Sequence, residues 1–245
     1  SKGGNCIIMN PQTGDILAMA SYPNYDLNSP FTPTSFYANN WDNLSSQDKS
    51  SRIYNMWAVR SVSETYEPGS VFKLITAAVA LEENITKTDI ANDFYCNGFE
   101  TVADKTIQCW YYQAPYYSKH DGESLREALM DSCNPSFIQL GKRIGAPTLY
   151  KYYNAFGLFD KTNSGLPGEA SGIFHELDKV GAVELATMSF GQRFTITPLQ
   201  MVTAISAIAN NGNLLQPKIV KSMTNTDTGE VTTFDANKVR QVISS

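Results

Sequence analysis

The stretch that decides the fold reads Tyr66-Glu67-Pro68-Gly69-Ser70-Val71-Phe72-Lys73, and an apolar run follows it as far as Glu83. Pro and Gly form turns, and the residues after them are apolar on most sides, which predicts a buried helix over 70–83. Ser70 then stands at the helix N-terminus, where the positive end of the helix dipole favours a developing alkoxide. Lys73 follows one turn later on the same face.

This S-x-x-K pattern has the properties of an activated serine. A lysine inside an apolar helix is poorly hydrated when charged, so its pKa should fall and its neutral amine can act as a base. We interpret Ser70 as a candidate nucleophile and Lys73 as its base. The pattern also arises by chance, and a second copy, Ser46-Gln47-Asp48-Lys49, lies in a polar stretch that cannot desolvate its lysine. We assign that copy no catalytic role.

A second candidate element is the S-x-N tripeptide Ser132-Cys133-Asn134. In an extended tripeptide the first and third side chains share a face, so Ser132 and Asn134 would both face a substrate while Cys133 points away. A hydroxyl there can relay a proton, and a carboxamide can hold a substrate amide. The alternative is a helix-capping serine followed by a turn asparagine.

The remaining pattern alternates helices with short hairpins. Apolar runs at 6–9 and 16–20 flank the turn formers 10–14, which predicts a hairpin whose continuous apolar character indicates cover on both faces. Residues 21–61 are expected to be irregular with short helical pieces, and 90–120 to be loop with a short hairpin. Further helices are predicted at 125–130, 136–144, 182–189 and, from the capping box at Thr197 and Gln200, 197–210. A last hairpin is expected around 227–230.

Composition narrows the class of protein. The 245 residues are 42% apolar, enough for a real core, and carry 24 acidic against 19 basic residues with no basic block, which argues against a nucleic-acid partner. No apolar run reaches the length of a membrane span. The chain opens directly on a strand-like run and ends without a terminating signal, so we expect it to be a piece of a longer protein.

Longer strings carry a family resemblance: residues 66–73, Ser132-Cys133-Asn134-Pro135, Ser189-Phe190-Gly191-Gln192 and Thr197-Pro198-Leu199-Gln200, together with the opening 9–21. Their order and spacing resemble the transpeptidase domain of class B penicillin-binding proteins over nearly the whole chain. The resemblance implies an α+β fold of the penicillin-binding protein and serine β-lactamase type, with an antiparallel sheet flanked by helices and a helical subdomain. Residues 1–245 would form part of one transpeptidase domain.

The resemblance also implies a function. Ser70 would be the acylated nucleophile, Lys73 its base, Ser132 the relay to the leaving amine and Asn134 a ligand of the substrate amide. The substrates would be peptidoglycan stem peptides, and β-lactam antibiotics would acylate the same serine. The parent protein would be anchored on the extracytoplasmic face of the bacterial membrane, within a cell-wall synthesis complex. A serine β-lactamase or β-lactam sensor, and a non-catalytic scaffold, remain as alternatives.

The family's third motif, K-T-G or K-S-G, does not occur in the sequence. Lys161-Thr162-Asn163 and Lys221-Ser222-Met223 approach it but lack the glycine that lets the backbone come close to a ligand. We therefore expect the third motif, the membrane anchor and the rest of the sheet to lie outside this chain, which would be inactive alone.

Cys96, Cys109, His120 and Cys133 are separated by twelve, ten and twelve residues. Three cysteines and one histidine make a closed structural zinc set when tetrahedral, and this one would fix Ser132 and Asn134 from behind. A cysteine inside the second motif, and the pair Cys109-Trp110, are similar to clostridial and sporulation-specific class B members. A Cys96–Cys109 disulfide and buried free thiols are the alternatives. Cys6 is expected in the core and His175 at the surface.

Overall fold

The structure, a computed structural model, describes residues 3–115 and 117–245. Its α-helices are α1 (Ser46–Trp57), α2 (Arg60–Ser63), α3 (Lys73–Glu82), α4 (Leu125–Met130), α5 (Asn134–Ile144), α6 (Ala146–Ala155), α7 (Ala182–Met188) and α8 (Pro198–Ala209). Short 3₁₀ turns are η1 (Trp41–Asn43), η2 (Gly69–Phe72) and η3 (Leu177–Lys179). The strands are β1 (Gly4–Met9), β2 (Ile16–Tyr22), β3 (Phe99–Val102), β4 (Lys105–Gln108), β5 (Asn213–Leu215), β6 (Ser222–Thr224), β7 (Val231–Thr233) and β8 (Lys238–Gln241).

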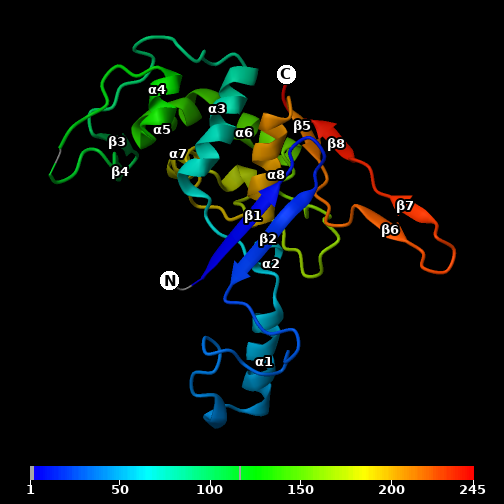
Figure 1. Ribbon diagram of the computed structural model, residues 1–245. Helices are drawn as coiled ribbons and strands as arrows, with labels where there is room; N and C mark the ends of the chain where they lie inside the picture. Colours follow the sequence, from blue (N-terminus) through cyan, green and yellow to red (C-terminus); the bar gives the residue numbers. More distant parts are fainter. Residues whose placement is uncertain (1–2, 116) are drawn as a thin grey trace.

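Helix α3 lies at the centre of the body, where it contacts α4, α5, α6 and α8 (Figure 1). Ile75, Ala77, Val79 and Ala80 are buried in the main core, which confirms a largely buried helix after Ser70, whereas Leu74 and Leu81 are partly exposed. The Phe72 ring packs edge-on against Tyr153 and Phe194, with centroids 5.2 and 4.7 Å apart. Edge-to-face aromatic packing adds to the favourable free energy of burial, so Phe72 fixes the turn that carries Ser70 to the core.

The strands form four separate two-stranded antiparallel sheets, β1–β2, β3–β4, β5–β8 and β6–β7. The hairpins predicted near the two ends and within 90–120 are confirmed. The expectation that β1 and β2 are covered on both faces is wrong for the described residues. Helices α2 and α8 contact β1, but most residues of this strand are exposed. Cys6 in β1 is accordingly exposed, against the expectation of a core residue, and His175 is exposed as predicted.

Helix α1 extends away from the body on an arm with its own small cluster of buried residues, Tyr37, Ile53 and Met56 (Figure 1). The prediction of an irregular segment with short helical pieces is too weak here, since α1 has twelve residues. Its N-cap is Ser45, whose hydroxyl accepts a hydrogen bond from Asp48 N at 3.1 Å. The second S-x-x-K copy lies on this arm. The polar exposed face of α1 hides its period in the sequence.

Helix boundaries follow the local signals closely where capping is strong. Helix α4 has the predicted bounds, and the predicted capping box of α8 is present: Gln200 N donates to Thr197 Oγ1 at 3.1 Å, and Thr197 N donates to Gln200 Oε1 at 2.8 Å. Helix α5 begins at Asn134, two residues before the predicted start. Helix α6 is not predicted at all. Within 3–115 and 117–245, no helix combines the length and the apolar character that a membrane crossing requires.

Candidate active site

Two glycines shape the turn that presents Ser70. Gly69 adopts φ +60°, and its N–H donates to the carbonyl of Gly191 at 2.8 Å. Gly191 has φ +83°, and a Cβ there would lie 2.2 Å from Gly69 O, so only glycine allows this approach. The neighbouring Ser189 carbonyl accepts from Thr76 Oγ1 of α3 at 2.9 Å. The loop 189–192 therefore holds the start of α3, and Ser70 lies exposed above it.

Lys73 is fully buried, and its ammonium group donates three hydrogen bonds to the short segment 132–134. Nζ donates to Ser132 O at 2.7 Å, to Ser132 Oγ at 3.0 Å and to Asn134 Oδ1 at 2.8 Å. Burial lowers the pKa of Lys73 to about 8, and the nearby Cys133, Cys109 and Glu123 oppose that decrease. The lysine is thus charged and held at neutral pH, yet able to lose its proton without leaving the physiological range.

Ser70 and Lys73 share a face, but no hydrogen bond joins them, and within the described residues the Ser70 hydroxyl has no partner. The three oxygens of Ser132 and Asn134 use all three protons of the ammonium group. A neutral amine has only two N–H groups and a lone pair, so deprotonation of Lys73 creates an acceptor for a hydroxyl proton. The geometry therefore suits a base that acts after it has lost its own proton.

The segment 131–134 is a helix end, not the extended tripeptide that we expected. Helix α4 closes in a Schellman motif, in which Cys133 N donates to Ala128 O at 3.0 Å and Ser132 N to Leu129 O at 3.2 Å. Ser132 occupies the left-handed position of that motif, with φ +52°, where glycine is usual. Helix α5 then begins at Asn134. The Ser132 and Asn134 side chains still meet at Lys73, while Cys133 turns to the opposite side.

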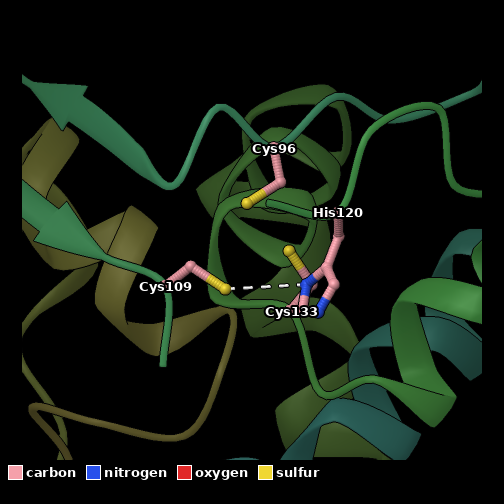
Figure 2. A group of neighbouring side chains, drawn as sticks. All are labelled: Cys96, Cys109, His120 and Cys133. Carbon is pink, nitrogen blue, oxygen red and sulfur yellow. Dashed lines mark hydrogen bonds between the residues drawn. The ribbon is translucent and has the colours of Figure 1, made fainter. Parts of the chain in front are cut away.

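On that opposite side lie the cysteines and the histidine that the spacing singled out. Cys96, Cys109, His120 and Cys133, together called the sulfur group, are buried, and one ligand atom from each lies within 4.8 Å of the others (Figure 2). None of these cysteines is in a disulfide. His120 Nδ1 lies 3.6 Å from Cys109 Sγ. Metal bonds of about 2.3 Å to sulfur and about 2.0 Å to nitrogen give a tetrahedral edge of about 3.5 Å, so the group fits a metal ion.

The β3–β4 hairpin explains how residues far apart in sequence meet here. Cys96 precedes β3 and Cys109 follows β4, and the pairing of Phe99 with Gln108 at the open end of the hairpin brings these two cysteines near each other. Backbone bonds then fix the ligands: Cys96 N donates to His120 O at 2.9 Å, and Cys109 N to Gly98 O at 2.8 Å. The group therefore spans the hairpin, the 120 loop and the end of α4.

Glu123 is a buried residue of this region that the sequence interpretation missed. It is 5% exposed, and its Oε2 accepts a hydrogen bond from Ser136 Oγ at 2.7 Å. Its Oε1 has no hydrogen-bond partner among the described residues and lies 3.7 Å from His120 Nδ1. Burial raises the pKa of Glu123. This unpaired carboxyl oxygen lies beside the sulfur group and is compatible with a cation there. Its signal in the sequence is a carboxylate three residues after a candidate ligand.

Comparison with protein families gives a match to the penicillin binding protein transpeptidase domain over residues 4–245. Stage V sporulation protein D of Bacillus subtilis is 39% identical over 223 residues, which are 88% of this chain and 30% of that protein. Peptidoglycan D,D-transpeptidase PbpA of Mycolicibacterium smegmatis is 32% identical over 98% of this chain and 48% of its own length. The chain thus spans less than half of the length of these two relatives.

Solved structures share the fold. Penicillin-binding protein A of M. tuberculosis, described as a ceftriaxone acyl-enzyme complex, superposes with a TM-score of 0.79 at 29% identity, over 98% of this chain and 52% of that one. Penicillin-binding protein 3 of M. tuberculosis, complexed with aztreonam, gives a TM-score of 0.78 at 24% identity, over 99% of this chain and 48% of that one. The mixed helix and strand fold expected from the resemblance is confirmed.

Proposed function

This chain belongs to the family of penicillin-binding protein transpeptidase domains, and from that premise we propose that it carries the acylation site of a peptidoglycan D,D-transpeptidase. The donor is a stem peptide that ends in D-alanyl-D-alanine, and the acceptor is an amine on a neighbouring strand. The observation that carries the proposal is the buried Lys73, held by Ser132 and Asn134 one turn after an exposed serine.

In the proposed reaction, Ser70 Oγ attacks the carbonyl carbon between the two D-alanines. The hydroxyl proton passes to neutral Lys73, and through Ser132 Oγ it reaches the amine of the departing D-alanine as the C–N bond breaks. The acyl group stays on Ser70 until the acceptor amine attacks it and returns a proton to the site. The Ser70 N–H, which has no partner in the described chain, can stabilise the oxyanion.

Asn134 is proposed to bind the substrate while it holds the base. Its Oδ1 accepts from Lys73, so its Nδ2 group stays available as a donor for a substrate carbonyl. A β-lactam presents a strained amide in place of the D-Ala-D-Ala bond, and Ser70 would attack it in the same way. No carboxylate of the described residues forms a hydrogen bond with Ser70 or Lys73, which favours a long-lived acyl-enzyme over a β-lactamase.

The proposal is tested by intact-mass analysis of the full-length parent protein after incubation with penicillin. We expect one stable adduct of penicillin mass, abolished in Ser70→Ala. The matched control is Ser46→Ala, which removes the serine of the other S-x-x-K copy and should label fully. Labelling of Ser70→Ala would rule out Ser70 as the nucleophile, and rapid loss of the adduct would indicate a β-lactamase.

We also propose that Cys96, Cys109, His120 and Cys133 bind one structural zinc ion. Three sulfurs and one nitrogen are a set typical of closed zinc sites, and such an ion supplies folding free energy and no acyl-transfer chemistry. Elemental analysis of the purified protein should find about one zinc per chain. Cys96→Ser should lose most of it, while Cys6→Ser, which changes the exposed cysteine, should keep it. Protein without metal would refute the site.

The setting of the reaction is proposed from the relatives. A peptidoglycan substrate requires the extracytoplasmic face of a bacterial membrane, and relatives named for peptidoglycan transpeptidation and for sporulation support a role in cell-wall synthesis. We propose that the parent protein has a membrane anchor and a K-T-G or K-S-G motif outside residues 1–245, because these residues contain no such motif and no apolar run long enough to span a membrane. We also propose that it works within a cell-wall synthesis complex. Fractionation of cells that express the tagged full-length protein should place it with the membrane.

A further inference from the structure

Trp110 connects the sulfur group to the turn that carries Ser132. It directly follows Cys109, and its Nε1–H donates to the carbonyl of Asp131 at 2.7 Å. The indole is about half exposed, so it forms part of the surface beside that turn. Asp131 is the residue immediately before Ser132. One side chain next to a candidate metal ligand therefore holds the peptide that leads into the second motif.

The carbonyl that Trp110 binds is one that the helix end leaves free. The Schellman motif satisfies the carbonyls of Ala128 and Leu129, and the last carbonyls of α4 need other donors. Trp110 supplies the donor for Asp131 O, and Lys73 supplies the donor for Ser132 O. The carbonyls of the two consecutive residues Asp131 and Ser132 are thus held by two different side chains.

Ser132 needs such support because its backbone conformation is unfavourable. Ser132 has φ +52°, and a residue with a side chain is strained in this left-handed region, so it keeps that conformation only when its surroundings fix it. Ser132 Oγ lies 3.0 Å from Lys73 Nζ. A shift of the Asp131 peptide would rotate Ser132 and break this hydrogen bond. The indole bond acts directly on that peptide.

Tyr111, the next residue, closes the connection to the histidine. Its ring stacks on the His120 imidazole, with centroids 4.8 Å apart and an angle of 8° between the planes. The Trp110 ring lies 5.3 Å from the Tyr111 ring. Three consecutive residues thus provide a candidate ligand, a bond to the Ser132 turn and a stacking partner of a second candidate ligand.

We propose that Trp110 is a positioning residue for acyl transfer, which holds the Asp131–Ser132 peptide so that the Ser132 hydroxyl stays aligned with Lys73. The proposal rests on the proposed function, since it assigns Ser132 to the acylation step. Trp110 acts through Ser132 and is not required to touch the reacting atoms. Its loss should therefore slow the chemical step far more than it weakens the preceding non-covalent binding.

The test compares Trp110→Phe with Trp57→Phe in the full-length, metal-loaded protein, with a chromogenic penicillin. Trp57 is a matched control, because its Nε1–H also donates to a backbone carbonyl, Pro30 O at 2.8 Å, but lies on the α1 arm. Stopped-flow kinetics separate the acylation rate constant from the dissociation constant of the non-covalent complex. We expect Trp110→Phe to lower the rate constant by about tenfold or more, with a change of less than about threefold in the dissociation constant. Trp57→Phe should acylate like the wild type.

A second variant guards against a general loss of folding. Trp110→Gln keeps an N–H donor without the ring, so it should retain more of the acylation rate than Trp110→Phe. Equal rates for wild type and Trp110→Phe, or a loss confined to the dissociation constant, would overturn the proposal. A penalty in Trp110→Gln as large as in Trp110→Phe would also overturn it. Wild-type protein that forms no adduct would overturn the proposed function, and this inference with it.

Discussion

The two sides of the 132–134 segment differ in how their buried polar groups are satisfied. On one side a buried cation, Lys73, uses every proton in hydrogen bonds to Ser132 and Asn134. On the other side three buried thiols gather with no disulfide, and Glu123 Oε1 has no hydrogen-bond partner in the described residues. Buried polar groups are normally satisfied, so the first side is complete as it stands, whereas the second has an unpaired carboxyl oxygen that the proposed metal ion would help to satisfy.

This difference teaches how a single tripeptide can serve two purposes. Ser132 and Asn134 of the S-x-N motif bind Lys73 of the proposed acylation site, and Cys133 between them belongs to the sulfur group. Any change that moves one side should be felt on the other, because no flexible linker separates them.

The largest effect is expected from Lys73→Met, which removes the proposed base and keeps most of the buried volume. The acylation rate should fall by a factor on the order of 10² to 10⁴, the range typical of a lost general base. The control is Lys49→Met, which changes the lysine of the other S-x-x-K copy. Lys49 lies on the α1 arm, with its Nζ 5.8 Å from the centroid of the Trp41 ring. Stopped-flow acylation by penicillin measures both. A Lys73→Met variant as fast as Lys49→Met would break the assignment of the base.

The next effect concerns the loop beneath Ser70. Gly191→Ala forces a Cβ to within 2.2 Å of Gly69 O, so the Gly69–Ser70 turn must move. Misplacement of a nucleophile by about 1 Å can cost as much as 10²-fold in rate. We expect acylation to slow by one to two orders of magnitude. Gly229→Ala is the comparison, because Gly229 also has positive φ, +71°, but nothing within 4 Å of the new Cβ. Equal rates in the two variants would contradict the role of this contact.

The pH dependence of acylation follows from the lowered pKa of Lys73, about 8. A base must be deprotonated to act, so the rate should rise with pH and level off above that pKa. Between pH 7 and pH 9 the neutral fraction changes by about tenfold. Acylation rates across pH 6 to 10, corrected for spontaneous hydrolysis of the penicillin, give the profile. A flat profile, or one that falls with pH, is incompatible with neutral Lys73 as the base.

The smallest effect isolates the backbone strain at Ser132. Ser132→Gly and Ser132→Ala both lose the hydroxyl, but only glycine relieves the left-handed conformation. The free energy of unfolding of Ser132→Gly should exceed that of Ser132→Ala by about 1 kcal/mol, as measured with denaturant. Ala103, with φ +53° between β3 and β4, is the calibration: Ala103→Gly should gain a similar amount. A more stable alanine variant at 132 would show that the turn is not strained.

Local signals predicted the strongly capped helices well, but they missed α1 and α6 and the long-range pairing of strands. The capping box at Thr197 and Gln200 and the 125–130 pattern gave the right starts because such bonds are formed within a few residues. The pairing of β5 with β8 joins residues more than 20 positions apart and carries no turn signal. Helix α6 follows Gly145 and contains Pro147, two residues that in the sequence resemble an end more than a beginning.

In the candidate site, too, contacts between residues close in sequence could be predicted, and contacts that depend on helix packing could not. Ser70 and Lys73 are neighbours by helical spacing alone, so the sequence is enough to bring them together. That Ser132 and Asn134 bind Lys73 depends on how α3 packs against the end of α4, which no spacing encodes. The left-handed φ of Ser132 was also hidden, because the sequence shows a serine where a Schellman motif usually has glycine. Glu123 and Trp110 gain their meaning only from their three-dimensional neighbours.

The most direct test of the shared tripeptide is the acylation rate of one full-length preparation before and after metal removal. If the proposed zinc ion fixes the S-x-N segment, a chelator that extracts it should slow acylation of Ser70 by about tenfold or more at a temperature where the protein stays folded. Added zinc should restore the rate. An unchanged acylation rate in protein shown by elemental analysis to be metal-free would contradict the claim that the sulfur group fixes Ser132 and Asn134.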